Sequence, residues 1–242
     1  MVYCKQNCFE AGGMQKCTED SDVHIIEGFL PPVWAVVWTV AAAPVVIYGA
    51  RRTLGLIRVD ARTKALVAVA AAFVFVLSAL KLPSVAGSSA HPTGTGVLVV
   101  LFGPAVTAFV SVIVLLYQAV LLAHGGVTTL GANVTAMGIV GPFAGWLAYR
   151  AARSVGSVQQ ATFLAATVTD WTTYLVTSLQ LGLAFPAGSD PAGVVTAALE
   201  FAAVFSVTQL PIGVLEGVLA AAMVGYLLRL ETDAAERLGV TA

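Results

Sequence analysis

Long apolar stretches recur along this chain after residue 31, and they restrict the folds that are open to it. About 20 predominantly apolar residues in an α-helix cross the roughly 30 Å hydrocarbon core of a bilayer. The composition fits such crossings, because 58% of the residues are hydrophobic and only 10% are charged, whereas about 25% are charged in a soluble domain. The sequence therefore predicts an all-α, polytopic membrane protein in which residues 23–242 form a single helical bundle.

Six segments are predicted to lie in the membrane, and two of them are longer than one crossing needs. The expected spans are residues 32–50, 63–81, 96–123, 134–150, 158–184 and 194–229. Gly103-Pro104 is predicted to interrupt the third span, and Gln209-Leu210-Pro211 the last one. Such breaks are tolerated where the freed backbone groups face protein or a cavity instead of lipid.

Cationic residues predict the orientation of the chain in the membrane. Five of them lie close together after the first span: Arg51, Arg52, Arg58, Arg62 and Lys64. The positive-inside rule places this first loop in the cytoplasm and the N-terminus outside. Arg150 and Arg153 also belong inside, so residues 96–123 must cross twice or re-enter. The result is a bundle of about seven transmembrane helices with a cytoplasmic C-terminus.

Residues 1–22 differ from the rest of the chain. They are polar, contain all three cysteines (Cys4, Cys8 and Cys17) and lack the apolar core of a signal peptide. The cysteine spacing C-x3-C-x8-C is not a usual zinc-ligand pattern. Three interpretations stay open: a metal-capturing tail, a disordered leader, or a mis-assigned start. We expect the last, which leaves these residues out of the mature protein.

The predicted topology places all three histidines, His24, His91 and His124, on the outer side of the membrane. His24 opens the string HIIEGFLPP, and His91 lies in SSAHPTGTG, a segment that cannot stay helical. Neutral imidazole is a common ligand of zinc, copper, nickel and cobalt. From the residues alone, each histidine is either a metal ligand or a surface or capping residue.

Six motifs follow one another along residues 24–219. They are HIIEGFLPPVW, SALKLPSVAGSSAHPTGTGVLVVLFGP, LLYQAVLLAHGGVTTLGAN, VGPF, TDWTTYLVTSLQLGLAFP and TQLPIGVLEGVL. Together they make the chain resemble the CbiM family, the membrane substrate-capture component of energy-coupling-factor transporters for cobalt, which has nickel-specific relatives. The resemblance implies a bundle in the cytoplasmic membrane that binds a divalent transition-metal ion at the outer face and supplies cobalamin biosynthesis. It implies a transporter subunit and not an enzyme, with Co(II) or Ni(II) as the transported ligand and no catalytic cofactor.

The resemblance also implies a set of metal ligands. They are the terminal amine at Val23, the backbone nitrogen and imidazole of His24, and the imidazole of His91. A nearly planar, all-nitrogen set suits Ni(II) and Co(II) better than Zn(II), which prefers a tetrahedron. Position 23 departs from the family, whose mature chain begins Met-His. Since GUG encodes valine internally but can start translation as methionine, we expect the chain to start at residue 23. The alternative is a leader that is removed by proteolysis.

Further polar residues in the same motifs are expected to hydrogen-bond to the ligating imidazoles and orient them. They are Ser88, Ser89, Thr93, Thr95, His124 and Asn133. The alternative is that each of them caps a helix end or satisfies loop backbone. Glu27 either pairs with the site or caps the first helix, and its string HIIEG resembles a cobalt-type start, which favours Co(II).

Three carboxylates fall inside predicted spans, where charged side chains are costly and are functional candidates by default. They are Asp170, Glu200 and Glu216. Asp170 lies among threonines and is expected to join a structural polar network, and the two glutamates could make interhelical contacts. None is expected to bind the metal, because carboxylates are harder donors than this cargo prefers.

The sequence contains no G-x4-G-K-[ST] motif, so the energy for transport must come from partners. The resemblance implies a transmembrane coupling component, cytosolic ATPase components and a small accessory membrane subunit. No basic stripe suggests a nucleic-acid partner. Two rival classes stay open. A vitamin-capturing component would need a roomy, aromatic-lined cavity, and an intramembrane enzyme would find neither H-E-x-x-H nor G-x-S-x-G in this chain.

Overall fold

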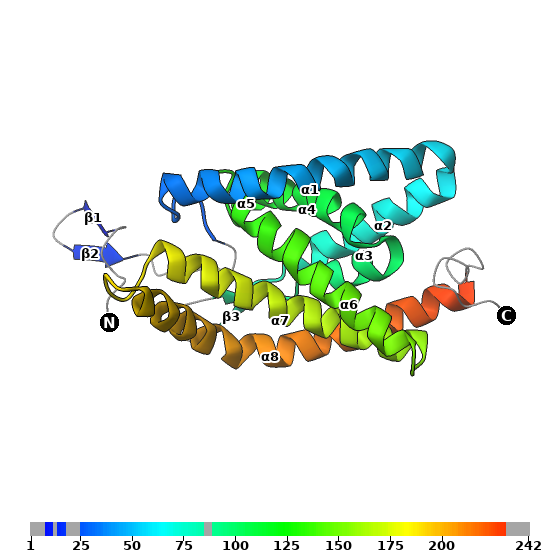
Figure 1. Cartoon of the computed structure of the whole chain (residues 1–242). Helices are drawn as coiled ribbons and strands as arrows, with labels where there is room; N and C mark the ends of the chain where they lie inside the picture. The colour runs from blue at the N-terminus through cyan, green and yellow to red at the C-terminus, as the bar shows by residue number, and fades with distance from the viewer. Residues whose placement is uncertain (1–7, 12–13, 18–24, 85–88, 231–242) are drawn as a thin grey trace.

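The computed structural model describes residues 8–11, 14–17, 25–84 and 89–230 and shows a bundle of long helices packed side by side (Figure 1). The helices are α1 (Pro32–Val59), α2 (Ala61–Ser78), α3 (Thr95–Phe102), α4 (Pro104–Leu122), α5 (Leu130–Asn133), the π-helix η2 (Val134–Val140), α6 (Gly141–Arg153), α7 (Val158–Ala184) and α8 (Pro191–Leu230). The described strands form two short antiparallel pairs, β1 (Cys8–Ala11) with β2 (Met14–Cys17) and β3 (Leu82–Pro83) with β4 (Ser89–Ala90). The predicted all-α bundle is confirmed. Val23, His24 and Ser88 lie outside the described residues.

Local sequence signals define several helix ends. Pro32 occupies the first turn of α1, where its missing N–H removes no helical hydrogen bond. Asp60 separates α1 from α2, and its side chain accepts hydrogen bonds from two N–H groups in the first turn of α2, which caps that helix. Ser157 and Gln160 form a reciprocal capping box at the start of α7. These signals place the turns between the long helices.

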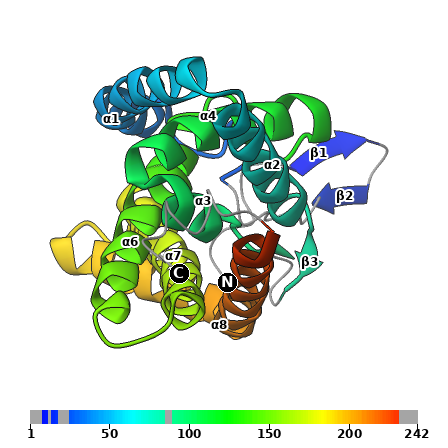
Figure 2. The ribbon, with the colours of Figure 1, turned by 90° about the vertical axis from the view of Figure 1, so that its right-hand side faces the viewer.

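Within the described residues, five helical stretches are long and apolar enough to cross a membrane: α1, α2, α4, the combined stretch Leu130–Arg153, and α8. α7 is also long, with 27 residues, and it carries several fully buried polar side chains, including Thr162, Thr169 and Gln180. α3 has only eight residues and therefore spans about 12 Å. It lies inside the bundle and contacts α2, α4, α6, α7 and α8 (Figure 2).

The break predicted in the third span is confirmed. α3 ends at Phe102 and α4 begins at Pro104, and Gly103 between them has a φ of +80°. A positive φ is readily available to glycine, and proline suits the first turn of the following helix. The two helices pack against each other, so the chain turns back on itself at this point, as a segment that crosses twice or re-enters must do.

Two details of the sequence prediction are wrong. α8 continues without interruption through Pro211, because neighbouring backbone and side-chain groups can compensate a proline inside a membrane helix. α1 continues to Val59. Arg51, Arg52 and Arg58 therefore lie on the helix and not in a loop. Long arginine side chains can extend from a helix end toward water, and a cation in the last turn interacts favourably with the helix dipole.

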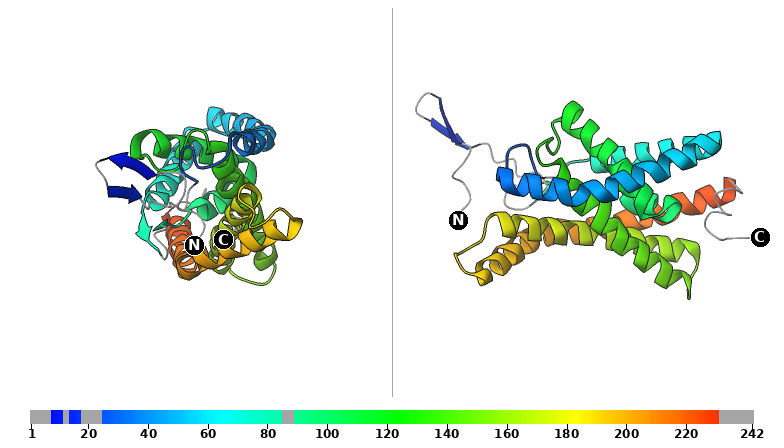
Figure 3. Two further views of the ribbon diagram at one scale, coloured as in Figure 1. Left: turned by 90° about the vertical axis from the view of Figure 1, so that its left-hand side faces the viewer. Right: turned by 45° about the horizontal axis from the view of Figure 1, so that its top comes forward.

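The bundle has two distinct ends. The α1–α2 turn, the α6–α7 turn and the end of α8 lie at one end, on the right of Figure 1, and the start of α1 and the α7–α8 connection lie at the other (Figure 3). Cationic residues flank the first end in the sequence: Arg58, Arg62, Arg150, Arg153 and Arg229. One end of the bundle is therefore markedly cationic, which is the asymmetry on which the positive-inside rule rests.

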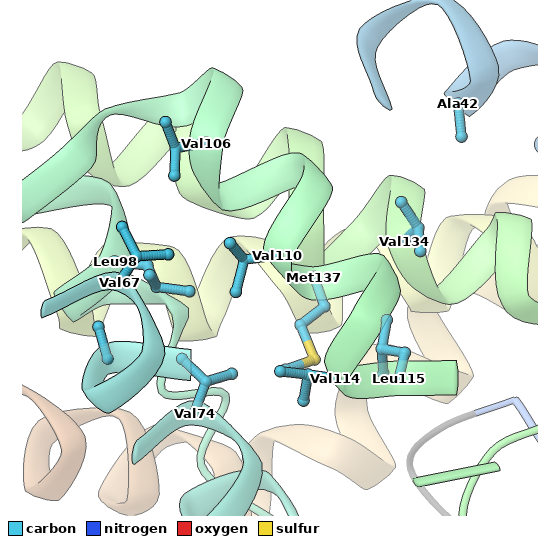
Figure 4. Packing of buried hydrophobic residues seen from close by; sticks show 11 residues of the cluster. Ala42, Val67, Val74, Leu98, Val106, Val110, Val114, Leu115, Val134 and Met137 are labelled. Atoms are coloured by element: carbon cyan, nitrogen blue, oxygen red, sulfur yellow. The ribbon is translucent and has the colours of Figure 1, made fainter. Parts of the chain in front are cut away.

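Among the described residues, four clusters of buried apolar side chains hold the helices together, and two of them are larger than the others. The first joins α1, α2, α3, α4 and η2, and Figure 4 shows its members from close by, among them Val74, Leu98 and Met137. The second joins the segment before α1 to α7 and α8, with Ile25 and Tyr174 among its members. The second cluster matters for the site, because it packs the residue that directly follows His24 into the bundle.

Candidate metal site

His91 lies in the loop between β4 and α3 and is only 2% exposed. Two helices hold its backbone carbonyl: the Tyr174 hydroxyl of α7 donates to it at 2.9 Å, and the Gln209 amide of α8 donates to it at 3.2 Å. The Nδ1 atom of His91 lies 3.0 Å from the carbonyl oxygen of Pro92. Since a carbonyl oxygen only accepts, this bond requires a proton on Nδ1, and Nε2 is then the unprotonated nitrogen of the neutral ring.

The residues after His91 are bonded to a carboxylate in α8. Glu216, which is 1% exposed, accepts hydrogen bonds from the N–H of Thr93, from the Thr93 hydroxyl at 2.9 Å and from the N–H of Gly94 at 2.9 Å. Gly94 has a φ of +72°, and a Cβ atom there would come within 2.9 Å of the Cα of Val74. The close approach and the positive φ both require glycine. Through these three hydrogen bonds, Glu216 fixes the backbone of the loop that carries His91.

His124 reaches the same place from the end of α4. Ala123 adopts a left-handed φ of +48°, and the N–H of His124 donates to the Gln118 carbonyl at 3.1 Å, which turns the chain. His124 is 1% exposed, and its ring centroid lies 5.1 Å from that of His91 in an edge-to-face arrangement. The structure thus brings together two of the three histidines that the predicted topology placed on one side of the membrane.

The segment that directly follows His24 is fixed at one point. The Ile25 N–H donates to the Asn133 side chain at 3.1 Å, and the Asn133 amide donates to the Ile25 carbonyl at 3.1 Å. The Thr129 hydroxyl donates to the same carbonyl. These bonds involve the backbone of Ile25, whose side chain is itself 3% exposed. Hydrogen bonding and burial therefore hold the chain in register immediately after His24.

Glu27 ties the same segment to the α4–α5 loop. Its carboxylate accepts hydrogen bonds from the N–H groups of Val127 and Thr128. The hydrogen bond from the Thr128 side chain is the main cause that lowers the pKa of Glu27; the backbone bonds from Thr128 and Val127 act in the same direction, and slight desolvation opposes them. α1 has no side-chain cap. The interpretation of Glu27 as a helix cap is therefore wrong, and its bonds go to the α4–α5 loop instead.

A small cavity lies between these parts. Among the described residues it is lined by His91, Asn133, Ala136, Met137, Thr173, Tyr174 and Thr177, and its volume is about 10 Å³, which is about the space that one water molecule needs. His91 and Asn133 both border it, so the histidine loop and the residue that holds Ile25 meet at one cavity. Pockets for organic ligands measure roughly 300–1,000 Å³. The cavity therefore matches an ion in size.

The remaining predicted residues also have defined places. Ser89 is half-buried in β4, and Thr93 and Thr95 are fully buried around the start of α3. Asp170 is fully buried in α7, and its carboxylate lies 3.5 Å from the Gln209 amide, in line with a structural polar network. Glu200 is exposed, so the two glutamates of α8 differ sharply in their surroundings.

Sequence reasoning missed the two residues that hold the carbonyl of His91. Tyr174 and Gln209 are 83 and 118 positions away from it in the chain. An amide inside an apolar span was an available signal for Gln209, because polar groups are rare there, whereas nothing distinguished Tyr174. Within the part of the chain that the structure describes, no group of three or more His, Cys, Asp or Glu side chains is placed to hold a metal ion.

The chain matches known sequences along most of its length. The family model described as "Cobalt uptake substrate-specific transmembrane region", CbiM, matches residues 24–234. A relative named CbiM from Haloquadratum walsbyi is 66% identical over 220 residues, which are 91% of this chain and 100% of the relative. The cobalt transport protein CbiM of Listeria seeligeri is 50% identical over 203 residues, which are 83% of this chain and 82% of the relative.

The fold is also known from crystal structures. One, of a transition metal transporter, matches with a TM-score of 0.74 and 25% sequence identity, covering 88% of this chain and 96% of the other. A truncated transition metal transporter matches with the same TM-score over 86% of this chain and 99% of the other. The family match, the relatives and the shared fold agree with the multi-pass helical bundle described above. The chain belongs to the CbiM family of cobalt uptake transmembrane proteins.

Proposed function

We propose that this protein captures Co(II), with Ni(II) as the close alternative, at the outer face of the cytoplasmic membrane. It passes the ion inward as the substrate-specific component of an ATP-driven energy-coupling-factor transporter, which supplies cobalamin biosynthesis. The observation that carries the proposal is the buried imidazole of His91, whose ring centroid lies 5.1 Å from that of the equally buried His124. Imidazole nitrogen suits both metals, and His91 borders a cavity of ionic size.

The proposed ligands are the terminal amine at residue 23, the backbone nitrogen and imidazole of His24, and Nε2 of His91. The bonds between Asn133 and Ile25 support this set, because Ile25 follows His24 directly and Asn133 borders the cavity that His91 lines. Metal binding at an amine and an amide releases protons, so the affinity should rise with pH.

A terminal amine at this position requires that the mature chain begin at residue 23, which a GUG start read as methionine would provide. The family match that begins at residue 24 supports this start. Residues 1–22 are then not part of the membrane domain.

Neighbouring polar residues are proposed to position these ligands: Ser88, Ser89, Thr93, His124 and Asn133. Asn133 acts through the backbone of Ile25, and Thr93 through its bonds to Glu216. The His124 ring restricts rotation of the His91 imidazole by edge-to-face packing.

The charge distribution supports the proposed orientation. Because the α1–α2 and α6–α7 turns lie at the cationic end, the positive-inside rule places that end in the cytoplasm and the start of α1 outside. Proposed partners are a transmembrane coupling component, cytosolic ATPase components and a small accessory membrane subunit. The sequence has no G-x4-G-K-[ST] loop, which supports ATP hydrolysis by separate subunits.

A vitamin-capturing component is the rival class closest to this one. It would need a cavity many times larger than the roughly 10 Å³ found beside His91. A cobalt-dependent rise in melting temperature at micromolar metal separates the two, because a vitamin-binding protein or an enzyme should not respond to cobalt in this way.

The proposal is tested by intact-mass analysis of the detergent-purified protein, expressed from its own upstream region and then titrated with Co(II) and Ni(II). We expect a chain that starts at residue 23 as methionine, one metal ion per chain, and loss of binding in His91→Ala. Thr196→Ala is the control, because this exposed hydroxyl bonds only to Ala192 in its own helix. A full-length mass with stoichiometric metal would contradict the terminal-amine ligand, and a wild-type protein that binds no cobalt would overturn the function.

A further inference from the structure

We infer that Glu216 is a positioning residue of the metal site and that it acts on the His91 imidazole through the peptide group between Pro92 and Thr93. The inference rests on the proposed function, because it takes His91 as a ligand. It assigns a role in metal capture to a buried carboxylate of α8 that contacts the loop after the ligand.

The Pro92–Thr93 peptide group is bonded on both sides. Its N–H, from Thr93, donates to Glu216 Oε2. Its carbonyl oxygen, from Pro92, lies 3.0 Å from His91 Nδ1. The described chain contains no cis peptide bond, so the N–H and C=O of this planar group point in opposite directions. The carboxylate therefore fixes the plane of the peptide whose carbonyl accepts from the imidazole.

Two more bonds to the same carboxylate remove the remaining freedom of the loop. The Thr93 hydroxyl and the Gly94 N–H both donate to Glu216 Oε1 at 2.9 Å. Two turns earlier on α8, Gln209 donates to the His91 carbonyl at 3.2 Å, and residues seven positions apart share a helix face. One face of α8 thus holds the backbone on both sides of Pro92.

The side chain of Glu216 accepts a set of hydrogen bonds that an amide side chain in its place could not accept. Its two oxygens accept from two backbone N–H groups at once, whereas the NH₂ of an amide is a donor and would oppose one of them. The bond from the Thr93 N–H to Glu216 polarises the peptide and makes the Pro92 carbonyl a better acceptor. That favours the Nδ1–H tautomer of His91 and presents Nε2 to the metal.

The test combines two readouts on three variants. Histidine-specific ¹⁵N NMR of the metal-free, detergent-solubilised protein reports the His91 tautomer, and titration with Co(II) reports the affinity. The variants are Glu216→Gln, Glu216→Ala and Glu200→Gln. The last one is the matched control, because it removes a carboxylate at an exposed position of the same helix.

We expect the wild type and Glu200→Gln to hold His91 as the Nδ1–H tautomer. Glu216→Gln should mix the two tautomers and weaken Co(II) binding by about 10- to 100-fold. Glu216→Ala should have a larger effect, so that glutamine partly rescues alanine. If Glu216→Ala does not fold, Glu216→Gln and Thr93→Val decide the question; Thr93→Val keeps the backbone bonds to Glu216 and removes the hydroxyl with its bonds to the carboxylate and to the Thr95 hydroxyl.

One result would overturn the inference: a Glu216→Gln protein that melts at a lower temperature but keeps the wild-type His91 shifts and cobalt affinity. In that case Glu216 would stabilise the fold without acting on the His91 imidazole. A wild-type protein that binds no cobalt removes the proposed function instead, and the ¹⁵N shifts of the metal-free variants still decide whether Glu216 sets the tautomer.

Discussion

Asn133 contacts both polar groups of the Ile25 backbone, accepting from its N–H and donating to its carbonyl, each at 3.1 Å. The two residues lie 108 positions apart in the chain. An amide side chain carries a donor and an acceptor together, so it can make both bonds to one residue. This contact fixes the chain one residue after the proposed ligand His24.

Replacement of Asn133 by aspartate tests that contact. Aspartate keeps the acceptor for the Ile25 N–H but places an oxygen against the Ile25 carbonyl, so one bond becomes a repulsion. We expect Asn133→Asp to weaken Co(II) binding by about 10- to 100-fold in a titration of the purified protein. Thr196→Ala is again the control. Undiminished affinity in Asn133→Asp would show that the Ile25 contact does not deliver the N-terminal ligands.

Gly94→Ala is expected to destabilise the protein and to weaken cobalt binding. The left-handed conformation costs a residue with a Cβ about 1–2 kcal/mol, and the new Cβ would come within 2.9 Å of the Cα of Val74. Gly55→Ala in α1 is the matched control, because nothing lies within 4 Å of its Cβ position. In a helix interior that change should stabilise by about 0.5–1 kcal/mol. Thermal unfolding in detergent measures both, and equal effects would contradict the interpretation of Gly94.

The docking of residues 25–28 should depend on pH through Glu27. Hydrogen bonds from Thr128 and Val127 lower its pKa below the ordinary value of 4.5. A carboxylate with a lowered pKa stabilises the docked state above that ordinary value, and the contribution is lost as the pH falls through the lowered pKa. Amide hydrogen-exchange protection of Val127 and Thr128 should fall in that range. Glu27→Gln should flatten the dependence, and an unchanged profile in that variant would assign it to another group.

Replacement by phenylalanine should affect Co(II) binding differently at His91 and at His124. His124→Phe keeps a ring that can pack edge-to-face on His91 but removes its nitrogens. We expect this variant to retain Co(II) binding within about 10-fold of the wild type, because its role is positioning, whereas His91→Phe should abolish binding. Complete loss of binding in His124→Phe would instead make His124 a ligand.

The sequence predicts those parts of the fold that depend on local chemistry. Apolar length locates the long helices, and Gly103-Pro104 identifies the turn between α3 and α4, because both residues have strong backbone preferences. Pro211 also has a strong backbone preference, and for that reason it predicted a break in the last span. The break is absent because the rest of the bundle holds the helix around Pro211. Local preference alone does not show whether a proline ends a helix, as at Pro104, or is tolerated inside one, as at Pro211.

The support of the candidate site is harder to predict. His91 follows from a motif, but its bond partners come from distant positions, and Glu216 lies 123 residues from Thr93. A lone carboxylate in an apolar span indicates that some partner exists. Which backbone groups it binds depends on the packing of α3 against α8, which no local pattern specifies. Ligand candidates and the polar residues of their own motifs were therefore accessible from the sequence, whereas the bonds from the distant Tyr174, Gln209 and Glu216 were not.

The π-helix η2 separates two faces of one continuous helical stretch. Before it, Asn133 bonds to Ile25, and after it Gly141 and Gly145 lie tightly against Thr173 and Thr169 of α7. A π-turn accommodates an extra residue compared with α-helical winding. Loss of one residue between 134 and 140 would therefore return this turn to α-helical winding, and loss of a second one would rotate the two faces relative to each other by about 100°. The residue count of this stretch, and not only its composition, therefore sets how Asn133 and the two glycines face their partners.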